Sequence, residues 1–126
     1  MSSEPALKST YILVVDDDPA VRDGLKFALE TDGMAVKTFP GGRQMLESGS
    51  LGKADCLILD CRMPEMDGFA VLAELAARKA RLPVILMTAP VTEAIRRRAR
   101  EAGAFNLLEK PLLGGILVDN IRRATT

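Results

Sequence analysis

Acidic, hydroxyl and ammonium side chains stand at the ends of hydrophobic runs in this sequence. Asp16 and Asp17 follow one run, Asp60 follows a second, and Thr88 and Lys110 follow two further runs. If these runs are parallel strands, the residues after them meet at the carboxyl edge of one sheet, where open α/β sheets bind their ligands. The spacing therefore predicts one site built from these five residues.

The residue types at this edge suit metal-assisted transfer of a phosphoryl group. Three clustered carboxylates repel one another and are costly to bury unless a cation is present. Because the available ligands are carboxylate and carbonyl oxygens, we expect Mg²⁺, with Mn²⁺ as the alternative. Asp17, Asp60, a backbone carbonyl near Arg62 and water would bind it, while Thr88 and Lys110 would hold the remaining phosphoryl oxygens. Asp60 is then the nucleophile that becomes an aspartyl phosphate.

Short apolar runs that could position this site alternate with longer segments of helical periodicity. The predicted strands are Tyr11–Val15, Ala35–Phe39, Cys56–Leu59, Val84–Met87 and Phe105–Leu108. Four of them are nearly continuous apolar runs, as in strands buried on both faces, whereas Ala35–Phe39 alternates like an edge strand. The predicted helices cover about residues 19–30, 42–47, 67–78, 92–102 and 113–123. Five βα units in series favour an α/β fold with a five-stranded parallel sheet, doubly wound and flavodoxin-like, in strand order 2-1-3-4-5.

Composition excludes several other kinds of chemistry. The chain has 126 residues and no His, so it contains neither a Ser-His-Asp triad nor a phosphohistidine carrier. Lys and Arg total 17, as do Asp and Glu, and this zero net charge gives no argument for direct nucleic-acid binding. Cys56 and Cys61 are five residues apart, an odd separation that would put them on opposite faces of one strand and that argues against a disulfide.

The length suits a single domain over residues 10–126, after a flexible polar lead-in at residues 1–9. No signal peptide opens the chain, and no apolar run reaches membrane-spanning length. We therefore expect a cytoplasmic protein that does not bind membranes.

Four strings of the chain resemble, in order and in spacing, the signature blocks of two-component response-regulator receiver domains, the CheY-like superfamily. They are Val14–Asp18, Leu59–Gly68, Met87–Ala89 and Glu109–Pro111, and the resemblance runs from about Ile12 to Arg123. The strings are also similar to those of FixJ-like transcription regulators of nitrogen fixation. An acidic pair after one strand would be a weak signal, but four blocks on four strands are a specific one.

The resemblance implies a role for each site residue. Asp60 matches the phosphoacceptor, Asp17 a direct Mg²⁺ ligand, and Asp16 the acidic partner that often reaches the metal through water. Arg62 matches the residue whose backbone carbonyl binds the metal. Thr88 matches the hydroxyl that follows the phosphoryl group and Lys110 the family's cation, with a cis bond expected between Lys110 and Pro111.

The resemblance also implies partners. The phosphoryl donor would be a phosphohistidine on a sensor histidine kinase or a phosphotransfer protein, with acetyl phosphate as a small-molecule substitute. Such a domain catalyses only its own phosphotransfer and dephosphorylation, so it is not an enzyme in the ordinary sense. Phosphorylation would switch the face formed by the fourth helix, fifth strand and fifth helix. This face, within residues 90–123, would control an effector domain or contact a second copy of the chain.

Three features near this face depart from the family pattern. Leu107 stands where the family often has an aromatic residue that turns inward when Thr88 moves. Pro90 lies in a loop that must shift on activation. Residues 112–115 open the last helix without an obvious polar cap. These departures argue against the usual aromatic signal, whereas phosphorylation is still expected.

The predicted helix at residues 92–102 carries a run of arginines. Ile95, Ala99 and Ala102 have the spacing of an inner face, so the arginines are expected on the outer one. We expect that face to be solvated, with a contact surface for a partner or second copy as the alternative.

Two other functions remain open from the sequence. A receiver-like module could bind partners regardless of phosphate, as Leu107 and Pro90 would allow. A small phosphatase could use an aspartyl nucleophile, but such enzymes commonly have a second Asp two residues further on, where this chain has Arg62.

Overall fold

The computed structural model describes residues 9–112 and 115–126. Apart from Ser9, the predicted lead-in at residues 1–9 lies outside the described residues. Leu113 and Gly114, in the predicted uncapped start of the last helix, also lie outside them.

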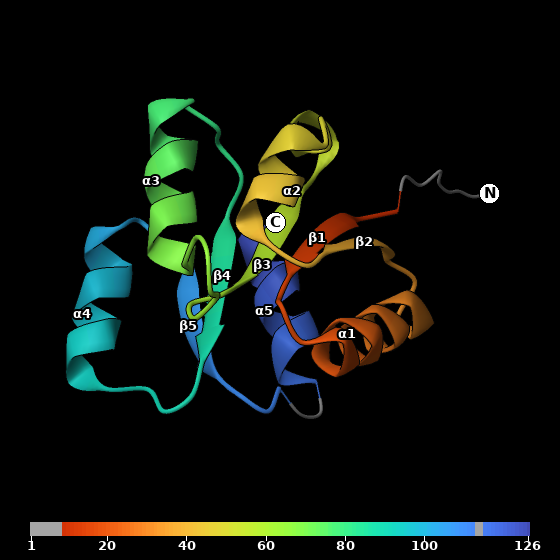
Figure 1. The fold of residues 1–126 in the computed structure, drawn as a ribbon. Coiled ribbons are helices and arrows are strands. Elements are labelled where there is room, and N and C mark those ends of the chain that lie inside the picture. Colours follow the sequence, from red (N-terminus) through yellow and green to blue (C-terminus); the bar gives the residue numbers. More distant parts are fainter. Residues whose placement is uncertain (1–8, 113–114) are drawn as a thin grey trace.

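Five strands form one parallel sheet in the order β2-β1-β3-β4-β5, which confirms the predicted doubly wound fold (Figure 1). The alternating strand β2 lies at one edge, as its sequence indicated, and β1 and β3 are hydrogen-bonded neighbours. The carboxyl ends of the central strands therefore lie side by side. The strands are β1 (Tyr11–Val15), β2 (Ala35–Phe39), β3 (Cys56–Asp60), β4 (Val84–Thr88) and β5 (Asn106–Glu109).

The helices begin where the sequence offers side-chain caps or a turn. The Asp18 carboxylate accepts the N–H of Ala20, and Asp67 and Thr92 likewise accept backbone N–H groups at the starts of two later helices. The helices are α1 (Pro19–Thr31), α2 (Gly42–Glu47), α3 (Gly68–Ala77), α4 (Glu93–Glu101) and α5 (Ile116–Ala124), and a short 3-10 helix, η2 (Leu51–Lys53), precedes β3.

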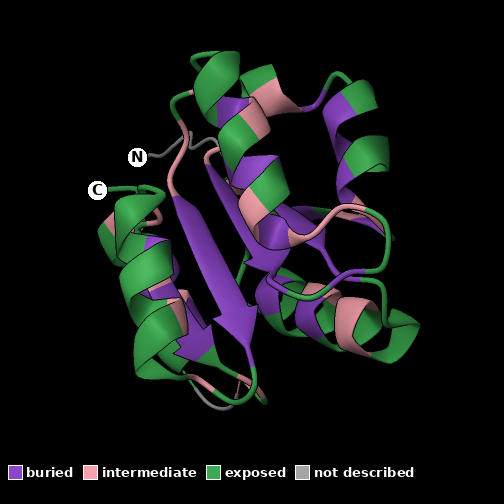
Figure 2. Ribbon diagram, turned by 60° about the vertical axis from the view of Figure 1, so that its left-hand side comes forward, coloured by how far each residue is buried: buried purple, intermediate pink, exposed green. Residues whose placement is uncertain are grey.

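Helices cover both faces of the sheet, so the strands form the buried middle layer (Figure 2). Successive side chains of a strand point to opposite faces, and the core accordingly divides into two clusters. Leu25 and Leu29 of α1 pack with Ile121 of α5 on one face. Residues of α2, α3 and α4 cover the other face, where Ala99 is the buried residue of α4.

Several predicted boundaries were wrong by a few residues. The strands β3 and β4 extend one residue further than predicted, because backbone pairing continues through Asp60 and Thr88 after the apolar pattern has ended. Phe105 precedes β5 and is 44% exposed. The last helix begins at Ile116, after Gly115 as its N-cap residue.

Ala102 was wrongly predicted to face the core. It lies past the end of α4 and is exposed. Gly103 has a φ of 86°, and the turn it makes brings Ala104 against the core instead.

Cys56 and Cys61 are buried free thiols in opposite core clusters, as the odd spacing indicated. Among the described residues, no helix is long and apolar enough to cross a membrane.

Candidate functional site

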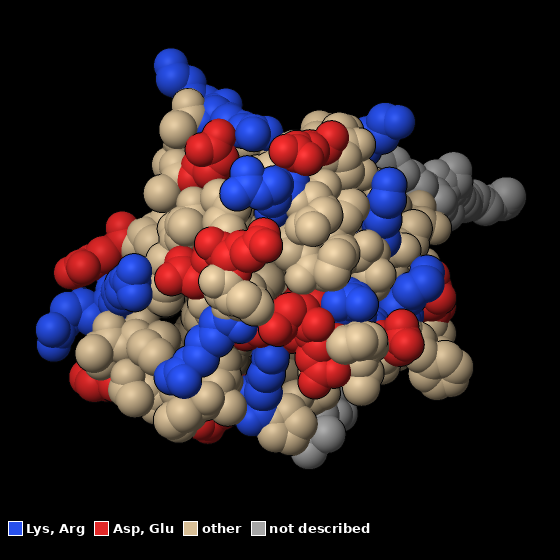
Figure 3. Space-filling view, in the orientation of Figure 1, with Lys and Arg blue, Asp and Glu red and all other residues tan. Residues whose placement is uncertain are grey.

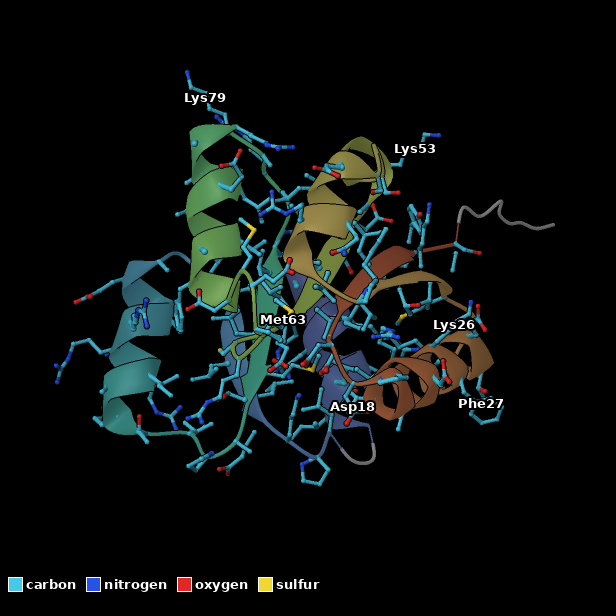
Figure 4. The ribbon with its side chains drawn as sticks, viewed as in Figure 1. Asp18, Lys26, Phe27, Lys53, Met63 and Lys79 are labelled. Atoms are coloured by element: carbon cyan, nitrogen blue, oxygen red, sulfur yellow. The ribbon has the colours of Figure 1, made fainter. Side chains whose placement is uncertain are left out.

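The carboxyl edge of the sheet brings together the carboxylates that the sequence singled out. Asp16 and Asp17 follow β1, and Asp60 is the last residue of the neighbouring strand β3. One oxygen from each of these three residues lies within 4.8 Å of the other two. Figure 4 labels Asp18 at the start of α1 and Met63 in the loop after β3, which mark the segments next to Asp17 and Asp60. The edge therefore offers a set of oxygen ligands suited to a hard divalent cation.

The three carboxylates differ in their exposure. Asp16 is fully buried and Asp60 is 4% exposed, whereas Asp17 is exposed. A cleft of about 220 Å³ begins at Asp17 and runs between the loop after β2 and the loop after β3. Figure 3 shows acidic side chains through the middle of this face with basic side chains around them. An ion would thus reach the cluster from the side of Asp17.

Lys110 joins the two buried carboxylates. Its Nζ lies 2.8 Å from Asp16 Oδ2 and 3.3 Å from Asp60 Oδ1. Burial lowers the pKa of Lys110, but the hydrogen bond to Asp16 and the charges of both carboxylates outweigh it, so the pKa is raised. The ammonium therefore remains charged at neutral pH and offsets part of the negative charge of the cluster.

Asp16 is held in place on several sides. Its Oδ1 accepts the N–H of Asp18 at 2.9 Å, and its backbone oxygen accepts from Arg22 at 2.7 Å. With Lys110 on Oδ2, both carboxylate oxygens already have donors within the protein. To bind a metal directly, Asp16 would have to break one of these hydrogen bonds. The arrangement therefore favours a role in which Asp16 supports the site through its negative charge.

Asp60 has the electrostatics of a buried acceptor group. Burial raises the pKa of Asp60, and the Asp16 charge adds to that rise, while the N–H of Arg62 and the ammonium of Lys110 oppose it. The Arg62 N–H donates to Asp60 Oδ1 at 3.2 Å. The part played by the Arg62 carbonyl as a metal ligand stays a prediction.

Thr88, the last residue of β4, is 1% exposed. Its Oγ1 is a buried side-chain oxygen without a hydrogen-bond partner among the residues that the structure describes. A buried hydroxyl left unsatisfied costs about 1–3 kcal/mol. This hydroxyl would therefore gain from an acceptor placed near the end of β3.

Gly68 was predicted only as part of the start of α3, and its closeness to the site was missed. A Cβ at this position would lie 2.7 Å from the backbone oxygen of Asp60 and 3.1 Å from the Cα of Cys61. The Gly68 N–H also donates to the Cys61 oxygen at 3.1 Å. Because Gly68 has no side chain, α3 can approach the backbone of Asp60. The Asp67-Gly68 pair was the only feature of the sequence that could have indicated this close approach.

Glu109 also has a role that sequence reasoning missed. Its Oε2 accepts the N–H of Val91 at 3.0 Å, which ties β5 to the loop between β4 and α4. That loop contains Pro90, and the Ala89–Pro90 bond is cis, as is the predicted Lys110–Pro111 bond. Leu107 is 8% exposed and packs in the same core cluster as Ala99 of α4.

The fold and the edge together define a class of protein. A sheet of order 2-1-3-4-5, with carboxylates after β1 and β3 and a lysine after β5, defines a CheY-like α/β domain. Residues 12–122 match the family described as the response regulator receiver domain. The chain therefore belongs to the receiver-domain family, whose members are signalling domains.

Curated relatives give the same assignment. The chain is 36% identical over 115 residues to the C4-dicarboxylate transport transcriptional regulatory protein DctD of Pseudomonas aeruginosa, covering 91% of this chain and 25% of DctD. It is 36% identical over 115 residues to the transcriptional regulatory protein FixJ of Azorhizobium caulinodans, covering 91% of this chain and 54% of FixJ. The chain thus spans a quarter to a half of the length of these relatives.

A solved structure supports the fold independently. The chemotaxis protein CheY4 of Vibrio cholerae superposes with a TM-score of 0.86 at 24% identity, covering 93% of this chain and 99% of CheY4. At this identity the likeness establishes the shared architecture.

Proposed function

We propose that this chain is a phosphorylation-competent receiver in two-component signalling. Asp60 would take a phosphoryl group from a phosphohistidine of a sensor histidine kinase or phosphotransfer protein, in a Mg²⁺-dependent reaction. The observation that carries the proposal is the position of Lys110, whose ammonium lies 3.3 Å from Asp60 beside a cluster of three carboxylates. An ordinary aspartate at the end of a strand would need neither group.

The chemistry follows from the residues at the edge. A carboxylate oxygen of Asp60 attacks phosphorus, a P–O bond forms, and the P–N bond to the donor imidazole breaks. Lys110 neutralises charge on the phosphoryl oxygens, and Thr88 donates its hydroxyl to one of them. Asp17, Asp60, the Arg62 carbonyl and, more remotely, Asp16 would hold Mg²⁺ or Mn²⁺, which supplies positive charge for the transferring group. Water attacking phosphorus would break the P–O bond to Asp60 and release inorganic phosphate, which would return the domain to its resting state.

The output would be a change in the face formed by α4, β5 and α5, within residues 90–123. A phosphoryl group gives Thr88 and Lys110 new acceptors, which would bias an existing equilibrium between two conformations. The Glu109–Val91 hydrogen bond links this face to the loop that follows Thr88. This face would control an effector domain or pair with a second copy, and we propose no direct contact with nucleic acid or membrane. Since sensor kinases phosphorylate their regulators inside the cell, the domain would act in the cytoplasm.

Intact-mass measurement with acetyl phosphate and Mg²⁺ tests the proposal. We expect the wild-type chain to gain the mass of one phosphoryl group, located by peptide mapping on Asp60, and to lose the gain when Mg²⁺ is chelated. Asp60→Asn should gain nothing. Asp23→Asn, an exposed aspartate on α1, is the matched control and should behave as wild type. A phosphoryl group that persists in Asp60→Asn would place the reaction elsewhere.

A phosphate-independent partner module is the second candidate, because Leu107 is aliphatic and buried at a position where the family often signals with an aromatic side chain. A chain that takes no phosphoryl group yet binds its partner would favour this second candidate. The alternative of a small aspartyl phosphatase gains no support from the family match.

A further inference from the structure

Cys61 and Thr88 lie on the same face of the sheet. Cys61 directly follows β3, and Thr88 is the last residue of the neighbouring strand β4. Leu57 and Leu59 of β3 belong to the core cluster on the α2–α4 side, as does Cys61, two residues further along. Val84 and Leu86 of β4 belong to the same cluster, so the alternation of the strand directs Thr88 to that side as well. In this conformation the Thr88 side chain therefore lies on the same side of the sheet as Cys61, and not on the side of the Asp60 carboxylate.

The two residues are held close together. The Cys61 N–H donates to the Met87 oxygen at 2.9 Å, which fastens Cys61 to β4 one residue before Thr88. Cys61 is 4% exposed, and the Thr88 hydroxyl is near enough to its sulfur to lower the thiol pKa, against the larger effects of burial and of the Asp60 charge. The geometry is nevertheless not that of a formed hydrogen bond, because Thr88 Oγ1 has no partner among the described residues.

The Cys61 side chain leaves the Thr88 hydroxyl without a good hydrogen bond because its polar atom is sulfur. A thiol is a weak donor and a weak acceptor, whereas an oxygen at the same position would bond well to a threonine hydroxyl. Thr88 therefore rests beside a poor partner, although a charged phosphoryl oxygen on Asp60 would be a strong one.

We propose that Cys61 is a positioning residue that sets the resting state of Thr88, by giving its hydroxyl a neighbour too weak to compete with a phosphoryl group on Asp60. The inference rests on the proposed function and adds a residue that controls how readily Thr88 is recruited. Replacing the sulfur by oxygen should stabilise the resting state and so weaken recruitment.

Beryllofluoride with Mg²⁺, a non-transferable mimic of the phosphoryl group, tests this without turnover. Cys61→Ser should bind it about three- to tenfold more weakly than wild type, which is the effect of one hydrogen bond of ordinary net strength in the unbound state. Cys56→Ser is the matched control, since Cys56 is a buried thiol at the start of β3, the strand that Cys61 directly follows, and packs on the opposite face of the sheet. Both serine variants should lose stability, but Cys56→Ser should keep wild-type affinity.

A double-mutant cycle separates positioning from general damage. In a Thr88→Val background the hydroxyl is gone, so Cys61→Ser should no longer change beryllofluoride affinity. The methyl resonance of Thr88 should also shift in Cys61→Ser before any ligand is added. If Cys61→Ser weakens binding equally in both backgrounds, or leaves it unchanged in the wild-type background, the inference is wrong.

Cys61→Ala keeps the inference testable if the serine variant does not fold. It removes the sulfur without adding an oxygen, so binding should equal or exceed that of wild type, and weaker binding would contradict the inference. A wild-type chain that neither takes a phosphoryl group nor binds beryllofluoride would instead remove the proposed function, and this inference with it.

Discussion

The guanidinium of Arg98 on α4 lies over the ring of Phe69 on α3, with Cζ 4.1 Å from the ring centroid. Ala99 is the buried residue of α4, and Ile95 is partly buried against the same core cluster, so the contact between Arg98 and Phe69 adds to a small apolar interface. A cation over an aromatic face is attracted by the ring quadrupole. The pair therefore connects the arginine-rich helix to α3, while the arginines of α4 are exposed, as the sequence predicted.

The first prediction concerns the strength of this contact. Replacing Phe69 by Leu and Arg98 by Gln, singly and together, should give a coupling of about 0.5–1 kcal/mol in the free energy of unfolding. Urea denaturation of the four proteins measures it. Arg97→Gln, an exposed arginine on the same helix, should show no coupling to Phe69. Strict additivity of Phe69→Leu and Arg98→Gln would contradict an energetic role.

A second prediction contrasts two glycines. Gly68→Ala should lower the free energy of unfolding by about 1–3 kcal/mol, because the new Cβ meets the backbone of Asp60 at 2.7 Å. It should also slow phosphorylation, since the acceptor residue must shift. Gly24→Ala, in the middle of α1 with no atom within 4 Å of the added Cβ, should raise stability by about 0.5–1 kcal/mol. Equal effects at both positions would argue against the close approach.

The third prediction follows from the raised pKa of Asp60 in the metal-free protein. Burial disfavours the charged carboxylate in the folded state, so its folded pKa lies above its unfolded pKa. The native state then binds more protons between these two values, and this group costs stability as pH rises through that window. In the presence of a chelator, Asp60→Asn should be more stable than wild type at neutral pH, and its advantage should shrink as the pH falls and Asp60 takes up its proton. Chemical denaturation of both proteins at a series of pH values measures the difference in their free energies of unfolding. If the advantage of Asp60→Asn grew as the pH fell, the prediction would be wrong.

Fourth, the acidic cluster should make stability depend on Mg²⁺. An ion that binds only the folded state at 100 times its dissociation constant adds about 2.7 kcal/mol to the free energy of unfolding. Asp17→Asn should lose most of this gain because it removes the exposed carboxylate of the cluster. Asp23→Asn should retain the gain. Melting temperatures of wild type, Asp17→Asn and Asp23→Asn across a Mg²⁺ titration measure the difference. A uniform response in all three would indicate nonspecific binding.

The fifth prediction concerns the two thiols. Burial is the largest cause that raises the pKa of Cys56 to about 12 and that of Cys61 to about 11. Neither should react at an appreciable rate with a thiol reagent at pH 8 in the folded protein, whereas both should react on unfolding. Because the folded pKa values are raised, their contribution to stability is lost as pH rises above about 9, where unfolded thiols ionise. Rapid labelling of either thiol under native conditions would show that its surroundings open easily.

Much of the fold could be predicted from local patterns. The caps at Asp18 and Asp67, the alternation in Ala35–Phe39 and the apolar strand runs are properties of neighbouring residues, and a few residues of sequence are enough to express them. The site could be located for the same reason, because the end of each strand can be read locally and the topology rules place those ends together. The errors lay at boundaries such as Phe105 and Ala102, where turn geometry outweighs periodicity.

The sequence by itself determined the strand order, the edge that carries Asp16, Asp17 and Asp60, and membership of a recognisable family. Only the tertiary structure decided that Lys110 sits closer to Asp16 than to Asp60, and that Gly68 lies against the backbone of the acceptor residue. It also decided that the Thr88 hydroxyl has no hydrogen-bond partner within residues 9–112 and 115–126. Periodicity and strand ends depend on residues next to each other in the chain. Distances between side chains depend instead on how strands and helices remote in sequence pack, to within a fraction of an ångström, and no local pattern encodes that.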